Sequence, residues 1–113
     1  MKTKYGQIIV GPKLISQIVA RAALESYGIV ALAGGSVKQR LVSIFNRDAI
    51  PPRSIEIKKA DDLLDLRIHV IVEYGVNIPE VTKNLSERIA YDVQHFTGLK
   101  TRSIEIVIEG VKS

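Results

Sequence analysis

The sequence predicts an α+β fold with the order β-α-β-(short α)-β-β-α-β, whose helices pack on one face of a mixed, largely antiparallel sheet. Strict alternation of apolar and polar residues in the second half is typical of half-buried strands. Two other stretches carry apolar residues on one side at helical spacing. The 113 residues are 46% apolar and 25% charged, so we expect one domain over residues 1–113.

The first half begins with a short apolar run, Gln7 to Val10, which predicts a strand. Gly11-Pro12 ends that strand and starts a helix, since proline suits the first helical turn. We expect Gly28 to end this helix in a left-handed conformation, and residues 29–33 to form a buried strand. The helix has its apolar stripe at Leu14, Ile15, Ile18, Val19 and Ala22.

Residues 36–48 have helical spacing of apolar side chains, with Ser36 as a reasonable N-cap. They predict a short helix, which Pro51-Pro52 cannot continue. Residues 54–58 alternate as a strand, and Asp61-Asp62 is typical of a turn. The next strand keeps strict period two through Leu64, Leu66, Ile68, Val70 and Val72.

A second long helix is predicted from Asn77, its N-cap, to Gly98, which stops it. Its apolar positions are Ile78, Val81, Leu85, Ile89 and Phe96, with Tyr91 and Val93 near the edge of the stripe. Ile104, Ile106 and Ile108 then give a last alternating strand, with Glu105 and Glu109 on its other side.

The face of the long strand opposite its apolar row carries Asp65, Arg67, His69 and Glu73, with Ile71 as the apolar exception. We therefore expect the outer face of the sheet to be charged and open to water or to a partner. Cross-strand ion pairing on a solvated face explains its carboxylates better than a hydrolytic site does.

No catalytic, cofactor or metal site is predicted. The chain has no cysteine, which excludes disulfides, thiolate metal sites and a cysteine nucleophile. His69 and His95 lack the spacing of metal ligands, and no serine-nucleophile motif occurs. Gly34-Gly35-Ser36 lacks the full phosphate-binding patterns and is interpreted as a turn, with anion binding a minority interpretation. We expect a protein that is not an enzyme.

The net charge of +4 is unevenly placed. Residues 1–60 hold ten basic and three acidic residues, and residues 61–113 hold six and nine. A candidate patch for an anion or partner consists of Lys38, Arg40, Arg47, Arg53, Lys58 and Lys59. It supports an alternative function, nucleic-acid or anionic-lipid binding, although only Phe45 is near to stack on bases. Ordinary solubilising charge is the simpler explanation.

No apolar stretch approaches the roughly 20 residues that cross a bilayer, and no signal-peptide pattern follows Met1. We therefore expect a cytoplasmic protein without direct membrane insertion, which meets a membrane from its surface or through a partner.

The segment Glu73 to Val81, reading EYGVNIPEV, resembles the signature of the alkaline shock, or envelope stress response, proteins of Gram-positive and related bacteria. The resemblance continues through Thr97-Gly98-Leu99 to the ending Val107 to Val111, and it includes the opening Tyr5 to Ile8. It covers nearly the whole chain in order. Residues 34–52 depart most from the family pattern.

The resemblance implies a small cytosolic protein linked to cell-envelope homeostasis and alkaline stress. Some members are held at the membrane by a separate anchor protein, and some are connected with fatty-acid metabolism. No catalytic residues are established for the family, so none are carried over.

Our first hypothesis is a binding or scaffolding module that self-associates, or docks onto an envelope-associated or lipid-metabolism partner, through its sheet edge or outer sheet face. A homo-oligomer is expected, and a membrane-anchored protein is a candidate partner. The candidate interface residues are Arg67, Ile71, Tyr74 and Val107.

Overall fold

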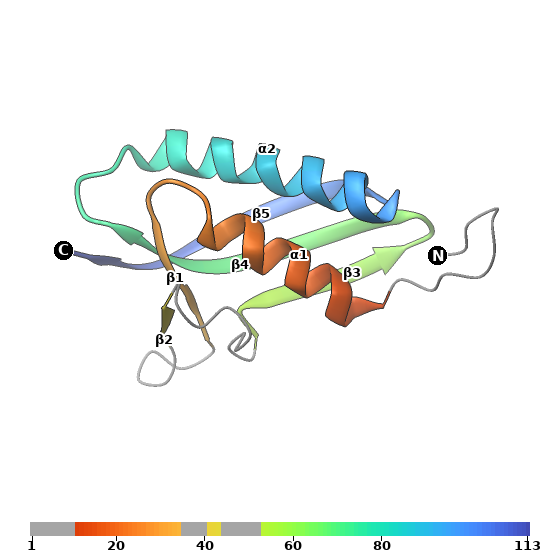
Figure 1. Cartoon of the computed structure of the whole chain (residues 1–113), viewed down its shortest axis with the longest axis horizontal. Coiled ribbons are helices and arrows are strands. Elements are labelled where there is room, and N and C mark those ends of the chain that lie inside the picture. The colour runs from red at the N-terminus through yellow and green to blue at the C-terminus, as the bar shows by residue number, and fades with distance from the viewer. Residues whose placement is uncertain (1–10, 35–40, 44–52) are drawn as a thin grey trace.

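The computed structural model describes residues 11–34, 41–43 and 53–113 of the chain (Figure 1). It has the predicted α+β architecture, with two helices and a mixed sheet. In chain order the elements are α1 (Pro12–Leu24), β1 (Ile29–Ala33), β2 (Leu41–Ser43), β3 (Ile55–Ala60), β4 (Leu63–Glu73), α2 (Ile78–Thr97) and β5 (Lys100–Lys112).

The long strand β4 is the centre of the sheet. β5 runs parallel to β4 from the Leu63–Lys100 pair to the Glu73–Lys112 pair, because α2 crosses over between them. On the other edge of β4, β3 pairs antiparallel with its first half and β1 with its second half. β2 continues the sheet antiparallel to β1. The predicted mixed, largely antiparallel sheet is therefore confirmed.

The core lies between the sheet and the two helices, which cover the same face and run in opposite directions (Figure 1). The period-two row of β4 is buried as predicted, with Leu64, Leu66, Ile68, Val70 and Val72 at most 2% exposed. From α2, four residues spaced four apart complete the core: Val81, Leu85, Ile89 and Val93. Neither helix covers the opposite face of β3, β4 and β5 (Figure 1).

The ends of α2 follow the prediction. The Oδ1 atom of Asn77 accepts a hydrogen bond from the backbone N–H of Glu80 at 3.1 Å, and Gly98 adopts the left-handed conformation with φ 79°. The start of α1 at Pro12 is also as predicted. The prediction that Gly28 ends α1 is wrong, because α1 ends at Leu24.

The difference at α1 has a local cause. The Ser26 hydroxyl donates to the Ala22 carbonyl at 2.6 Å, and Ser26 N–H donates to the Ala23 carbonyl, so the chain leaves the helix in a turn. Gly28 is left-handed with φ 87°, but it leads into β1. A Cβ atom at Gly28 would lie 2.7 Å from Cγ2 of Val81 on α2. The glycine therefore allows the turn to approach α2 closely.

Two further predictions are wrong in part. Residues 41–43 form strand β2, where a helix was expected, because their backbone pairs with Ala31 to Ala33. The rest of the expected 36–48 helix, and the expected strand at 7–10, lie outside the described residues. Phe96 is 64% exposed and lies beside α1, while Val93 continues the four-residue spacing and is fully buried.

Candidate interaction surface

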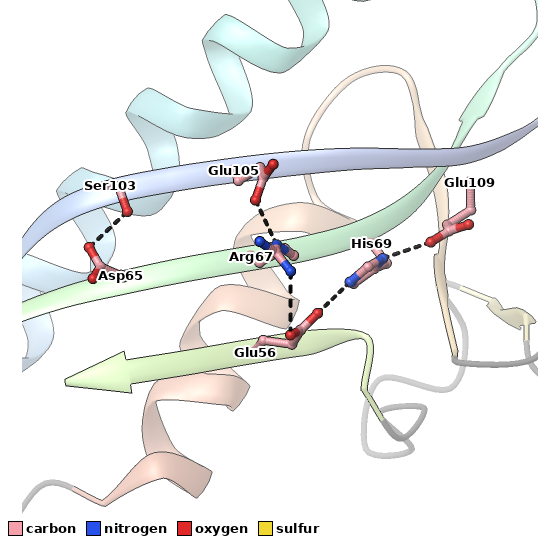
Figure 2. Close-up of polar contacts among 7 residues, drawn as sticks. All are labelled: Glu56, Asp65, Arg67, His69, Ser103, Glu105 and Glu109. Carbon is pink, nitrogen blue, oxygen red and sulfur yellow. Dashed lines mark hydrogen bonds and ion pairs between the residues drawn. The ribbon is translucent and has the colours of Figure 1, made fainter.

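The face of the sheet opposite the helices carries a cross-strand network of charged side chains, shown in Figure 2. We call it the outer sheet face, and it is built on β3, β4 and β5. Its members are Glu56, Lys58, Asp65, Arg67, His69, Ile71, Ser103, Glu105, Val107 and Glu109. The predicted charged outer face is therefore present in the structure.

Arg67 is the central cation of this face. Its Cα is paired with that of Glu56 on β3 and with that of Glu105 on β5, so the three residues form a row across the sheet. Arg67 Nε donates to Oε1 of Glu105 at 2.6 Å, and Nη1 lies 3.8 Å from Oε1 of Glu56 (Figure 2). The hydrogen bond from Arg67 to Glu105 raises the pKa of Arg67 further above its usual value.

His69 bridges two carboxylates. Its Nε2 lies 2.7 Å from Oε2 of Glu56, and its Nδ1 lies 2.7 Å from Oε2 of Glu109 (Figure 2). An ionised carboxylate only accepts hydrogen bonds, so both ring nitrogens donate when both contacts form, and the ring is then positively charged. Burial alone would lower the pKa of His69, but the hydrogen bonds with Glu56 and Glu109 outweigh it and raise that pKa.

A β-bulge brings Glu109 to His69. The Cα partner of His69 on β5 is Val107, and the register shifts after the Val70–Ile108 pair, which leaves Glu109 as the extra residue. The side chain of Glu109 can then reach the imidazole. Glu56 connects both cations, because one of its oxygens faces Arg67 and the other faces His69. The hydrogen bond with His69 lowers the pKa of Glu56.

A second bulge forms a separate polar cluster at the other end of the outer sheet face. The register shifts from the Leu64–Thr101 pair to the Asp65–Ser103 pair, which leaves Arg102 as the extra residue. Arg102 Nε donates to Asp65 Oδ1 at 3.0 Å, and the Ser103 hydroxyl donates to the same oxygen at 2.8 Å. These hydrogen bonds, that of Arg102 first, lower the pKa of Asp65 to about 2.

Three of the four candidate interface residues, Arg67, Ile71 and Val107, lie on this face. Arg67 has 51% of its side chain exposed. Ile71 and Val107 are only partly exposed, although they were expected to be exposed, and Ile71 packs next to Gly110 on β5. Tyr74 follows the end of β4 and is 73% exposed, while its N–H donates to the Lys112 carbonyl at 2.8 Å.

The predicted basic patch is described only in part. Lys38, Arg40 and Arg47 lie outside the described residues. Lys58 and Lys59 are neighbours on β3, so their side chains point to opposite faces of the sheet, and Lys58 is paired with Asp65. Arg53 precedes β3 in a left-handed conformation with φ 64°. The described members therefore do not form one continuous positive surface.

Sequence reasoning missed Arg102 and the bridging geometry of His69. Both depend on the bulges of β5, and the polar run Thr101 to Ser103 and the Glu109-Gly110 pair are the sequence signals at those points. Within residues 11–34, 41–43 and 53–113, no group of three or more His, Cys, Asp or Glu side chains is arranged so that it could hold a metal ion. No helix in the described part of the chain is long and apolar enough to cross a membrane.

Comparison with known proteins matches the whole sequence to one protein family. Residues 1–113 match the model of the alkaline shock protein family, described as having a cell envelope-related function. The uncharacterized protein YloU of Bacillus subtilis is 30% identical over 99% of this chain and 93% of its own length. The uncharacterized protein Spy1614 of Streptococcus pyogenes is 26% identical with the same coverage, and YqhY of Bacillus subtilis is 26% identical over 97% and 80%. No solved structure matches the chain.

Proposed function

Since this chain belongs to the alkaline shock protein family of cell envelope-related proteins, we propose that it is a non-enzymatic binding module that docks an envelope-associated protein through its outer sheet face. In this proposal the module acts in the cytoplasm and reaches the membrane only through that partner. The observation that carries the proposal is the fixed network of charges on a sheet face that neither helix covers.

Fixed charges favour recognition of a specific partner. Long charged side chains on a free surface lose conformational freedom when a partner immobilises them, and this loss weakens binding. On the outer sheet face, the contacts of Arg67 and His69 already hold both side chains. A partner with complementary charges would therefore bind a surface that is ordered in advance.

The same face offers apolar contacts beside the charges. Ile71 and Val107 are partly exposed between the charged rows, and the ring of Tyr74 is exposed at the end of β4. Protein interfaces combine such an apolar centre with a polar rim, and tyrosine is among the residues enriched in them. This arrangement supports Ile71, Val107 and Tyr74 as contact residues.

The mixture of charges favours a protein partner over a polyanion. Lys58, Arg67 and protonated His69 are interspersed with four carboxylates, those of Glu56, Asp65, Glu105 and Glu109. Nucleic acids and anionic lipid surfaces bind best to surfaces of uniform positive charge. The outer sheet face carries charges of both signs, which does not suit a polyanion. Binding of nucleic acid or anionic lipid through the basic residues is therefore kept as the alternative function.

The proposal is tested by affinity capture with the tagged full chain from lysate and solubilised membranes of the native host, at low and at high salt. We expect a discrete protein partner that survives high salt. The variants Arg67→Glu and Ile71→Ala should lose it, after circular dichroism has verified their fold. Lys13→Glu makes the same charge reversal on exposed Lys13 of α1 and should retain the partner.

Two results would contradict the proposal. One is a partner that both outer-face variants retain as well as the natural sequence does. The other is recovery of nucleic acid or anionic lipid without any protein partner, and only at low salt. That result would favour the alternative function, which is binding through the basic residues.

A further inference from the structure

Strand β5 has an edge that no other described strand uses. It pairs with β4 along its whole length, from Lys100 to Lys112, and within residues 11–34, 41–43 and 53–113 nothing pairs with its other side. Backbone N–H and C=O groups along such an edge can extend the sheet into another strand. β5 is 13 residues long, so this edge is the longest that a strand of the described sheet offers.

The inward side chains of this edge are apolar and incompletely covered. Ile104, Ile106 and Ile108 pack against the core, yet all three remain partly exposed. Their neighbours in the pairing with β4, which are Leu66, Ile68 and Val70, are at most 2% exposed. The difference arises because β4 has strands on both sides, whereas β5 has one only on the β4 side.

Open space lies above the edge. A hollow of about 390 Å³ separates the first half of α2 from β5, and it is lined by Pro79, Thr82, Lys83, Ser86, Ile104, Glu105 and Ile106. Sheet edges are commonly protected by a charged side chain that points inward. The inward positions 104, 106 and 108 are all isoleucine, so the centre of this edge has no such protection.

We propose that β5 pairs antiparallel with β5 of a second copy of this chain, around a two-fold axis at Ile106. In this register Ile106 lies opposite Ile106 of the partner subunit, and Ile104 lies opposite Ile108 of the partner subunit. The isoleucine stripe then continues from one copy into the other. The hollow beside α2 leaves room for the partner's side chains.

The charges near the centre of the outer side favour this register, whose like charges, Lys100 opposite Lys112 of the partner subunit, lie at the two ends of the strand pair. With the axis at Ile106, Glu105 lies opposite Val107 of the partner subunit, so no like charges meet at the centre. Moving the axis to residue 105 places Glu105 opposite its own copy, and moving it to residue 107 places Glu105 opposite Glu109 of the partner subunit. Like charges directly opposite each other destabilise a strand pair.

The inference goes beyond the proposed function, because it concerns the edge of the sheet and leaves the outer sheet face open. A two-fold axis perpendicular to the sheet keeps the helices of both copies on one side. The two outer sheet faces then lie next to each other on the other side. Either proposal can therefore fail without the other.

Because the chain contains no cysteine, disulfide trapping tests this register directly. The Ile106→Cys variant should form a covalent dimer of twice the 12.5 kDa chain mass on mild oxidation. Residues opposite each other in an antiparallel pair have Cα atoms about 4.5–5.5 Å apart, which is within disulfide range. Sedimentation of the natural chain over a range of concentrations should show a reversible dimer.

Two matched variants serve as controls. Ile104→Cys alone and Ile108→Cys alone should form no covalent dimer, because each cysteine is about 13 Å from its own copy in this register. An equal mixture of these two variants should cross-link. A natural chain that is monomeric at every concentration would overturn the proposal. So would a dimer in which Ile106→Cys cross-links no better than the two single controls.

Discussion

Nε2 of His69 lies 2.7 Å from Oε2 of Glu56, and this contact ties the centre of β4 to β3. The same ring contacts Glu109 of β5 through Nδ1. One imidazolium therefore connects three strands of the sheet. Loss of its proton would leave a ring nitrogen with a lone pair facing a carboxylate, so the contact depends on pH.

The first prediction concerns the pH dependence of stability. The pKa of His69 is raised in the folded protein above its ordinary value of 6.5. Its contribution to stability is therefore fully present below pH 6.5 and is lost as the pH rises through the raised pKa. We expect the unfolding midpoint to fall with rising pH in that window, and to fall less in His69→Gln. Histidine ring signals in NMR titrations give the pKa directly.

The other histidine provides the control for this prediction. The ring of His95 stacks on Tyr91 at 5.6 Å and meets Phe96 edge-on, so it has aromatic neighbours where His69 has carboxylates. The His95→Gln variant leaves a single histidine ring signal, that of His69, and so assigns the two signals in the NMR titration. A His69 signal that titrates at or below pH 6.5 would contradict the proposed bridge.

The second prediction compares two left-handed glycines. Gly28 and Gly75 have similar φ angles, 87° and 90°, so alanine is strained at both positions. Only at Gly28 does the new Cβ atom meet a neighbour, Val81, at 2.7 Å. We expect Gly28→Ala to lower the free energy of unfolding by roughly 1–3 kcal/mol more than Gly75→Ala, as overpacking does. Urea denaturation measures both, and equal losses would refute the close approach.

The third prediction concerns the N-cap of α2. Replacing Asn77 with alanine removes the acceptor of the Glu80 N–H and should lower the free energy of unfolding by about 1 kcal/mol. Asn77→Asp keeps an acceptor oxygen at the same place and should lose much less. Denaturant unfolding of the two variants checks this, and an alanine variant as stable as the natural chain would show that the cap contributes nothing.

The fourth prediction separates the two sides of α2. Leu85 is fully buried, so Leu85→Ala should cost roughly 2–5 kcal/mol of unfolding free energy. Phe96 is 64% exposed, and Phe96→Ala should cost far less although it removes a larger side chain. Thermal or urea unfolding of the two variants measures both losses of unfolding free energy. Comparable losses would mean that Phe96 belongs to the core after all.

Local patterns predicted the parts of the fold that local forces determine. The period-two row of β4 alternates because one face is buried, and the Asn77 cap and Gly98 stop act within one helical turn. The predicted end of α1 at Gly28 failed for a local reason, the Ser26 turn, and two other predictions failed where distant contacts decide the outcome. Pairing with β1 holds residues 41–43 in a strand, and packing beside α1 leaves Phe96 outside the core.

For the outer sheet face too, local patterns predicted one part and could not predict another. Alternation along β4 correctly placed Arg67, His69 and Ile71 on one outer face. It could not reveal which carboxylates they meet, because Glu109 and Arg102 reach β4 only through bulges in β5. A bulge shifts the register of every later pair, and the sequence marks it only weakly.

The most direct test of the central claim is photo-cross-linking in the native host from two positions of the full chain. A photoreactive amino acid replaces Ile71, on the outer sheet face, or Tyr91, which is 66% exposed on α2. The account predicts a specific adduct with another protein from position 71 and none from position 91. A protein adduct from position 91 alone, or no protein adduct from position 71, would contradict docking through the outer sheet face.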